Sequence, residues 1–418
     1  MWVPQRVRKM KKEYCFILDI SRLLSRAGQS VPTGIDRVEL AYAEHLLTHY
    51  EKQTHFVSAT FYGRINFLPR KKTIFFIQLL LSGWNFGSHA SISKSKRLSV
   101  YLKIISSINF ICPKIEKVSF YFLLSHHHLT RRDSIQKFIR NSSAYFIPMV
   151  HDIIPIEYPE YSRPREKLRH RKRIDTVLEL ANAVIVPTNY VKKSLSSLLD
   201  KESKHNVPIW SIPHGVYERK TPIPHEENIS IKIHKPYFVY LSTIEPRKNH
   251  LLLLHIWRKM IEDHGKESTP HLVLVGKRGW ENENILDLLE RSPALQGIVH
   301  EKSHLSDRDV VTLLKQSNGL LFPSFSEGYG LPLAEAISLS VPCICSDIPA
   351  LREVGKDLPF YLDPLDALKW REVISDFARK GPLWKKQKES LKNWQPFPWS
   401  DSIETAIFLC ITSNEKFQ

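Results

Sequence analysis

Residues 322–347 read FPSFSEGYGLPLAEAISLSVPCICSD, a stretch that predicts a strand running into a glycine-bearing turn and then a helix. Gly328 and Gly330 in the turn would let the backbone approach a ligand closely. The amides of Gly330, Leu331 and Leu333 would face that ligand at the positive end of the helix, where phosphates bind. We therefore expect a diphosphate site at this turn.

Two carboxylates accompany the turn. Glu327 lies within it, and Glu335 lies a little over one turn into the helix. Both could reach one elongated ligand at different places, and carboxylates are good acceptors for the hydroxyls of a sugar and a ribose. Taken alone, either glutamate has a structural explanation, which for Glu327 is the helix dipole that stabilises a nearby acidic residue by about 0.3 to 1 kcal/mol. Taken with the glycines, the pair favours a binding role.

The alternation of strand and helix continues on both sides of this stretch. In the second half we expect strands at 237–241, 271–275, 297–300, 319–322 and 341–345, and helices at 251–262, 285–290, 307–316 and 331–339. In the first half we expect strands at 14–20, 144–150, 183–187 and 209–212, and helices at 36–50 and 164–182. The fold class predicted is α/β, with two Rossmann-like doubly wound domains facing a cleft.

The domain boundary is expected near residue 230. The chain has 418 residues, more than one hydrophobic core usually serves. A polar stretch with Pro222, Pro224 and Pro236 separates the two sets of strands. We therefore predict domains at 1–230 and 231–390, followed by a C-terminal helical segment at 391–418.

The composition indicates a folded, basic protein. Lys and Arg outnumber Asp and Glu by 60 to 43, which gives a formal charge of +17 and predicts anionic partners. Nucleic acid, anionic lipid and phosphorylated small molecules all satisfy that charge. No aromatic-rich RNA motif or helix-turn-helix signature accompanies the basic residues, so charge alone does not choose among the three.

The chain contains no apolar run of the roughly 18 to 20 residues that a spanning helix needs. The five scattered cysteines lack metal-ligand spacing and suit a reducing cytoplasm. Residues 61–129 mix apolar and basic side chains without clear breaks. We interpret them as core packing under solvated lysines, the alternative being a surface for a lipid-linked substrate. The expected location is the cytoplasm, with possible peripheral contact at an anionic inner membrane.

The segment SEGYGLPLAEA, with FPS before it and VPCICSDIPALREV after it, resembles the retaining glycosyltransferases of family 4, which have the GT-B fold. The resemblance extends to STIEPRKN at 242–249, which is similar to the family's donor-phosphate loop and includes Ser242 and Thr243. It implies that Lys248, with Arg247, neutralises the diphosphate leaving group. It also implies that Glu335 holds the ribose and Glu327 the transferred sugar.

The N-terminal half resembles transferases of bacterial polysaccharide assembly through DISRLL, PTGIDRVELAYA and HDIIPIEYPEY. The resemblance places Gly34 near the donor phosphates and His151 against the donor sugar. A hydrogen-bonded core histidine is the alternative reading of His151. The sequence FPWSDSIETAIFL at 397–409 is similar to the family's closing helix, which returns to the N-terminal, acceptor-binding domain.

The resemblance implies a retaining hexosyltransferase that moves mannose or a similar sugar from a GDP- or UDP-sugar. The acceptor implied is a glycan or lipid-linked oligosaccharide in O-antigen, capsule or exopolysaccharide synthesis. No cofactor beyond that co-substrate and no nucleic-acid partner is expected. The alternatives are a GT-B sugar-nucleotide epimerase and a basic protein that binds nucleic acid or anionic surfaces.

No required metal is expected. His126, His127 and His128 are adjacent in sequence, and adjacent helical residues point to different sides. The sequence Asp307-Arg308-Asp309 matches the metal motif of other glycosyltransferases, but it opens a predicted helix and is interpreted as a cap.

Overall fold

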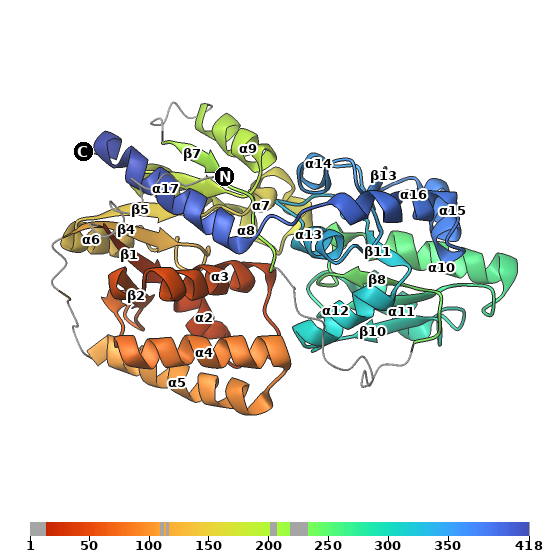
Figure 1. Ribbon diagram of the computed structural model, residues 1–418, viewed down its shortest axis with the longest axis horizontal. Helices are drawn as coiled ribbons and strands as arrows, with labels where there is room; N and C mark the ends of the chain where they lie inside the picture. Colours follow the sequence, from red (N-terminus) through yellow and green to blue (C-terminus); the bar gives the residue numbers. More distant parts are fainter. Residues whose placement is uncertain (1–13, 109–112, 114–116, 201–206, 218–232, 418) are drawn as a thin grey trace. The chain divides into compact units, whose positions relative to one another are not determined.

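A computed structural model describes residues 14–108, 113, 117–200, 207–217 and 233–417, which form two compact units (Figure 1). Unit 1 contains the described residues of 1–157, 164–215 and 397–418, and unit 2 those of 158–163 and 216–396. The short segment 158–163 therefore belongs to unit 2, although it comes from the first half of the chain. The boundary predicted near residue 230 lies outside the described residues.

Unit 1 contains a five-stranded sheet in the order β3-β2-β1-β4-β5. All neighbours pair in parallel except β2 and β3, which pair antiparallel. A parallel bridge between Met149 and Ile185 joins this sheet to the parallel pair β6 and β7. The strands are β1 (Tyr14–Asp19), β2 (Thr54–Ala59), β3 (Ile65–Phe67), β4 (Val118–Leu123), β5 (Ala144–Pro148), β6 (Val184–Val186) and β7 (Ile209–Ser211).

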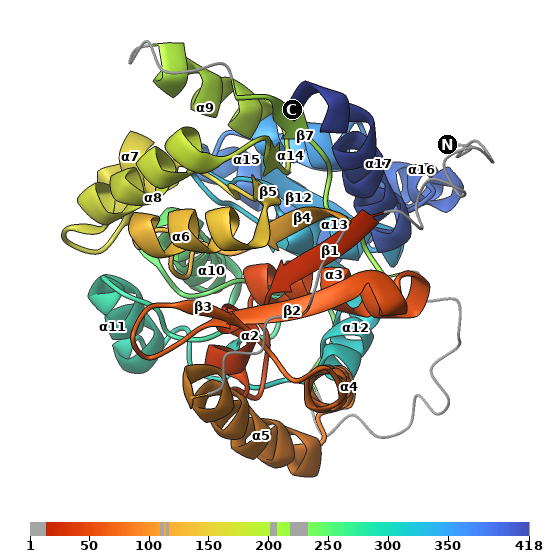
Figure 2. The ribbon, with the colours of Figure 1, turned by 90° about the vertical axis from the view of Figure 1, so that its left-hand side faces the viewer.

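The unit 1 helices cover the sheet. They are α2 (Ser21–Arg26), α3 (Gly34–His49), α4 (Arg70–Phe86), α5 (His89–Ile108), α6 (Arg132–Ser142), α7 (Ile154–Glu157), α8 (Glu166–Leu180), α9 (Asn189–Asp200) and α17 (Trp399–Phe417). In two views, α4 and α5 lie side by side at the edge of the unit, with α5 farther from the sheet (Figures 1 and 2).

Residues 61–129 supply more than the sequence predicted. Besides α4 and α5 they contain β4, a central strand whose sequence VSFYFL is almost wholly buried between β1 and β5. A strand buried on both faces is continuously apolar, so its composition matches that of the neighbouring helices. The interpretation of this region as core packing is wrong for the outer face of α5, where Tyr101, Ile104 and Ile108 are exposed.

The terminal helix α17 is fastened to unit 1 by residues far away in sequence. Glu404 accepts a hydrogen bond from the Tyr50 hydroxyl at 2.7 Å and lies 3.0 Å from His45 Nε2. Ser402 donates to the Pro213 carbonyl at 2.6 Å. A Cβ at Gly215 would lie 2.3 Å from the Trp399 backbone, so a residue without a side chain is required at that contact.

Unit 2 contains a six-stranded sheet in the order β10-β9-β8-β11-β12-β13, with every pairing parallel. Its strands are β8 (Tyr237–Leu241), β9 (His271–Val275), β10 (Val299–Lys302), β11 (Gly319–Phe322), β12 (Cys343–Ser346) and β13 (Phe360–Leu362). The order reverses between β8 and β11, which is the topological switch point of a doubly wound sheet. The predicted α/β fold class, with a largely parallel sheet in each unit, is confirmed.

Helices lie on both faces of this sheet (Figure 1). They are α10 (His250–His264), α11 (Glu283–Arg291), α12 (Asp307–Gln316), α13 (Leu331–Ser338), α14 (Pro349–Gly355), α15 (Ala367–Ala378) and α16 (Pro382–Ser390). The cap predicted at Asp307-Arg308-Asp309 is confirmed. Ser306 accepts from the Asp309 amide at 3.2 Å, and Asp309 accepts from the Ser306 amide in return.

Candidate functional site

The candidate site lies at the switch point of the unit 2 sheet. Strands β8 and β11 are parallel neighbours, so the loops that follow Leu241 and Phe322 leave the sheet at the same edge. Ligands of open α/β sheets bind at that edge, beside the switch point. These two loops carry most of the residues that the sequence singled out.

The loop after β8 is held close to its neighbour. Ser242 donates its amide to Val275 at 3.0 Å, and Ile244 donates to Lys277 at 2.9 Å. A Cβ at Gly276 would lie 1.8 Å from the Ser242 carbonyl oxygen, so only glycine permits this approach. The loop then forms a 3₁₀ turn at Pro246–Lys248, and α10 begins at His250. Ser242 and Thr243 are half-buried at the start of this loop.

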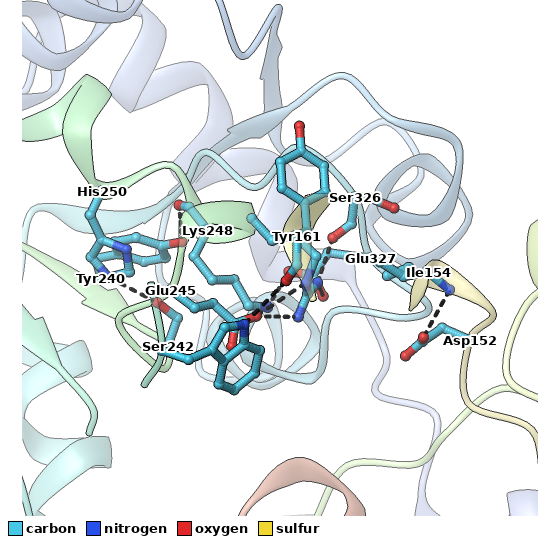
Figure 3. Close-up of polar contacts among 12 residues, drawn as sticks. Asp152, Ile154, Tyr161, Tyr240, Ser242, Glu245, Lys248, His250, Ser326 and Glu327 are labelled. Atoms are coloured by element: carbon cyan, nitrogen blue, oxygen red, sulfur yellow. Dashed lines mark hydrogen bonds and ion pairs between the residues drawn. The ribbon is translucent and has the colours of Figure 1, made fainter. Parts of the chain in front are cut away.

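Four charged side chains meet between the two loops: Glu245, Arg247, Lys248 and Glu327. Arg247 Nη2 lies 2.9 Å from Glu245 Oε1, and Arg247 Nη1 lies 3.0 Å from Glu327 Oε2. The Lys248 ammonium donates to the other oxygen of Glu327. Figure 3 shows Lys248 and Glu327 pointing toward one another. We call these four residues the ion cluster.

Burial and charge fix the protonation states of the ion cluster. Burial alone would raise the pKa of Glu327, but the charges of Lys248 and Arg247 outweigh it and lower the pKa to about 2. The pKa of Lys248 is lowered by burial and by Arg247, an effect that Glu327 opposes. Glu327 is therefore a carboxylate at neutral pH, and it holds two cations at the end of β8.

The turn after β11 brings a helix start to the same loops. Gly330 has φ 99°, and a Cβ there would lie 2.6 Å from the Leu351 side chain, so glycine is required. Gly330 is the N-cap of α13 and Leu331 is its first residue, so that helix offers their amides no acceptor. The expectation for Leu333 is wrong, because its amide donates to the Gly330 carbonyl at 3.0 Å. Glu335 is half-buried on α13, and Gly328 is buried beside Glu327.

Sequence reasoning missed an aromatic clasp on this site, formed by Tyr161, Phe325 and Trp280. The Tyr161 and Phe325 rings stack with centroids 5.7 Å apart and 1° between their planes. Trp280 Nε1 donates to the Tyr161 carbonyl at 3.2 Å, and the Phe325 amide donates to the Arg247 carbonyl at 2.9 Å. The clasp thus joins segment 158–163 to the loop that carries Glu327. The sequence EYPEY at residues 157–161 contains Tyr161, but nothing in it predicts a contact with Phe325.

The roles of Glu245 and Ser326 were not predicted from the sequence either. Glu245 is buried and accepts from two nitrogens of Arg247, at 2.9 and 3.1 Å, which orients the guanidinium. The Ser326 carbonyl accepts from Arg247 Nη1 at 2.5 Å. An acidic residue two positions before an arginine on a strand-end loop was the signal that could have indicated Glu245.

Two predicted site residues lie in unit 1, and one of them belongs to a row of histidines. The His151 ring lies 5.5 Å from the rings of both His126 and His214, and His126 lies 5.0 Å from His170. Burial lowers the pKa of each of the four, which keeps them neutral. His151 Nε2 lies 2.8 Å from the Leu124 carbonyl. We call these four side chains the histidine row.

Gly34, the other predicted site residue of unit 1, is the first residue of α3. Thr33 caps this helix, and Asp36 completes a capping box by accepting from the Thr33 amide at 2.7 Å. Asp36 is also ion-paired with Arg22 at 2.6 Å and Arg26 at 3.3 Å. The glycine therefore starts a helix whose first turn is fixed by charge.

Metal-ligand geometry is not seen in the described part of the chain, where no three His, Cys, Asp or Glu side chains are grouped to hold an ion. Within the adjacent histidines, His128 Nε2 lies 3.0 Å from Asp19, which also accepts from the Tyr121 hydroxyl at 2.8 Å. Likewise, among the described residues no helix has the length and apolar character to cross a bilayer.

The two α/β units define a GT-B fold. The charged loops after β8 and β11 lie at the switch point of its unit 2 sheet. The chain is similar to sucrose-phosphate synthase from Thermosynechococcus elongatus, with a TM-score of 0.60 and 14% identity over 96% of this chain and 100% of that one. It is also similar to trehalose 6-phosphate synthase from Burkholderia multivorans, with a TM-score of 0.58 and 10% identity over 97% and 99%. Residues 224–394 match the model of the family "Glycosyl transferases group 1".

The chain is homologous to O-antigen mannosyltransferases. It is 29% identical to O-antigen chain mannosyltransferase B of Escherichia coli, over 54% of this chain and 62% of that protein. It is 26% identical to the serotype-specific mannosyltransferase WbdA of Escherichia coli, over 59% of this chain and 30% of that protein. The matches thus span less than two thirds of the length of these two relatives.

Proposed function

We propose that this protein is a retaining glycosyltransferase that moves mannose, or a similar hexose, from a GDP-sugar to a glycan or lipid-linked oligosaccharide. The observation that carries the proposal is the ion cluster, in which Arg247 and Lys248 are held by Glu327 at the sheet's switch point. Two fixed cations beside a helix start are suited to a diphosphate. The family of residues 224–394 and the mannosyltransferase relatives support the same reading.

In this proposal the donor's diphosphate contacts Lys248, Arg247 and the amides of Gly330 and Leu331. Each Glu327 oxygen accepts one hydrogen bond from a cation and can accept another, so the carboxylate can also hold a sugar hydroxyl. Glu335 would bind the ribose from α13. By the resemblance described above, the remaining donor contacts are Ser242, Thr243, Gly328, Gly34 and His151.

The transfer would be driven by stabilisation of the departing diphosphate. Arg247 is already oriented by Glu245 and Glu327, so little reorganisation is needed when negative charge develops on the leaving group. The acceptor hydroxyl would attack the oxocarbenium-like carbon on the face that the diphosphate leaves, and a phosphate oxygen would take its proton. This route retains the anomeric configuration, and it calls for no metal and no covalent enzyme intermediate.

The names of two relatives, which assign them to O-antigen chains, support the proposed class of acceptor. We propose an acceptor of O-antigen, capsule or exopolysaccharide assembly, and an enzyme in the cytoplasm at the inner face of the plasma membrane. GDP is favoured over UDP because residues 245–249, EPRKN, resemble loops of GDP-mannose-dependent members. Nucleic acid is not a partner in this proposal.

The test is transfer from a panel of GDP-, UDP- and dTDP-sugars to solubilised lipid-linked acceptors, with the product's anomeric configuration read by NMR. We expect product from a GDP-sugar only when acceptor is present, with configuration retained. Conversion of the nucleotide-sugar without acceptor would support the epimerase alternative. Failure of every donor to react or bind, together with tight binding of nucleic acid, would leave the +17 charge as the better guide to function.

A further inference from the structure

The α4–α5 hairpin of unit 1 lies in a stretch of one-sided charge. Residues 52–115 contain ten Lys or Arg and no Asp or Glu, in a chain that elsewhere mixes both signs. The hairpin's exposed basic residues include Lys71, Lys72, Lys94 and Arg97. No acidic side chain of this stretch can neutralise them, so the hairpin attracts anions.

The outer face of α5 is apolar where a surface helix is usually polar. Val100 is 51% exposed, Tyr101 43%, Ile104 45% and Ile108 67%. Residues at this spacing share one side of a helix with Arg97. On α4, Phe75 is 51% exposed, and Lys72 Nζ lies 5.8 Å from the Tyr101 ring, which connects the two helices' exposed sides.

The buried side of α5 explains why these apolar residues face outward. It consists of Ser95, Ser99, Leu102 and Ser106. Ser99 and Ser106 donate to carbonyls of their own helix, at 2.8 and 3.0 Å, so they can pack without other polar partners. The helix therefore packs three serines and Leu102 inward and leaves Val100, Tyr101, Ile104 and Ile108 exposed, whereas an ordinary core-facing helix buries its apolar stripe.

We propose that this face, formed by Lys71, Lys72, Phe75 and the exposed residues of α5 from Lys94 to Ile108, docks on an anionic lipid bilayer. Lysines and arginines beside exposed aliphatic and aromatic side chains suit a surface that is anionic outside and apolar beneath. A second copy of the chain would bring the same basic residues together and be repelled. Nucleic acid would match the charge but leave the isoleucines without a partner. The inference rests on the proposed function, because it brings the enzyme to a lipid-linked acceptor.

The test is flotation of the full chain with vesicles of phosphatidylcholine, alone or with about one third phosphatidylglycerol. The two variants are Lys94→Glu/Arg97→Glu and Ile104→Ser/Ile108→Ser. The matched control is Lys385→Glu/Lys386→Glu on α16, which changes the net charge equally at exposed positions of unit 2. We expect binding only to the anionic vesicles, weakened about tenfold or more by each face variant. The control variant should bind like wild type.

Binding unaffected by both face variants, or lost equally in the control, would overturn the proposal. So would tighter retention on duplex DNA than on anionic vesicles through the same residues. Stabilisation by GDP and transfer to detergent-solubilised acceptor are measured on every variant, because the changed residues lie outside the proposed donor site. If the wild type transfers the sugar but does not bind anionic vesicles, the docking face is refuted and the proposed function stands. If the wild type does not bind GDP, the proposed function itself is refuted.

Discussion

The ion cluster of unit 2 and the histidine row of unit 1 are both largely buried groups of four titratable side chains, but they differ in whether those side chains are charged. In the ion cluster, Glu327 and its cations stay ionised because each charge has a partner within hydrogen-bond distance. In the histidine row, the rings touch one another, and burial keeps them neutral. A partner of opposite charge keeps a buried side chain ionised, whereas burial beside side chains of the same kind keeps it neutral.

This difference assigns the two groups different chemistry. The ion cluster presents two cations, Arg247 and Lys248, that carboxylates hold in place at a sheet's switch point, which suits the proposed diphosphate site. The histidine row presents neutral hydrogen-bonding groups, so His151 can contact a sugar hydroxyl without attracting an anion. The predictions below separate the two groups by their response to mutation and to pH.

The largest effect is expected for Lys248→Ala. In the proposed function Lys248 contacts the leaving diphosphate, so its removal should reduce kcat/KM by about 10³-fold, on the order of 4 kcal/mol of transition-state stabilisation. Steady-state transfer from the GDP-sugar measures it. The matched control is Lys259→Ala, which removes an exposed lysine of α10 paired with Asp263 at 2.6 Å. Equal losses in both variants would contradict a specific role for Lys248.

Glu327→Gln should destabilise unit 2 by about 3 kcal/mol at neutral pH, since the pKa of Glu327 falls from 4.5 to about 2 on folding. A lowered carboxyl pKa contributes stability that is complete above 4.5 and lost as the pH falls toward 2. The gap between wild type and variant should therefore close across that window. Hydrogen exchange of unit 2 peptides at several pH values measures it, and a gap that does not depend on pH would refute the ionised pair.

The histidine row should make unit 1 sensitive to milder acid. The pKa of His126 lies well below its ordinary value of 6.5 because of burial and of His170 and His151, so the stability it contributes is present above 6.5 and lost as the pH falls. Each such histidine costs up to about 1.4 kcal/mol per pH unit below 6.5. His126→Leu should flatten the unit 1 stability curve below about pH 6.5.

Hydrogen exchange of unit 1 peptides provides the comparison for the histidine row, with His255→Leu on the exposed side of α10 as the control. An unchanged slope in His126→Leu would mean that His126 is charged in the folded unit. A changed slope in the control would mean that the acid sensitivity does not come from the row.

The smallest effect is expected for the aromatic clasp. Tyr161→Leu removes the stack on Phe325 and should cost about 1 kcal/mol, with a rise in the donor's KM because Phe325 adjoins the Glu327 loop. Tyr161→Phe keeps the stack and should behave like wild type in both measurements. Loss in the phenylalanine variant would show that the hydroxyl matters and the stack does not.

The strands β8 to β12 of unit 2 could be predicted because they lie between glycines, prolines or polar loops, as β8 and β11 do, whereas the three-residue strand β13 was not predicted. In unit 1, β2 could not, since THFVSA follows a helix after one 3₁₀ turn without glycine or proline. Strand β4 could not either, because its apolar run follows two apolar helices.

Some contacts of the candidate sites could likewise be predicted from the sequence, and others could not. Lys248 and Glu327 are 79 positions apart, but each lies in the loop that follows a predicted strand, and parallel neighbours bring such loops together at one edge of the sheet. His126, His170 and His214 could not be joined to His151 from sequence, since they come from separate segments without a shared pattern. The Tyr161–Phe325 stack is another contact that only the fold reveals.

The central claim is that the ion cluster binds a nucleoside diphosphate, and thermal stabilisation by GDP, GMP and guanosine tests it most directly. Wild type should be stabilised far more by GDP than by GMP, and guanosine should have the smallest effect, because Arg247 and Lys248 contact the phosphates. Lys248→Ala should lose the advantage of GDP over GMP, while Glu335→Ala should weaken all three. Equal responses to GDP and guanosine, or a Lys248→Ala variant that responds like wild type, would contradict the account.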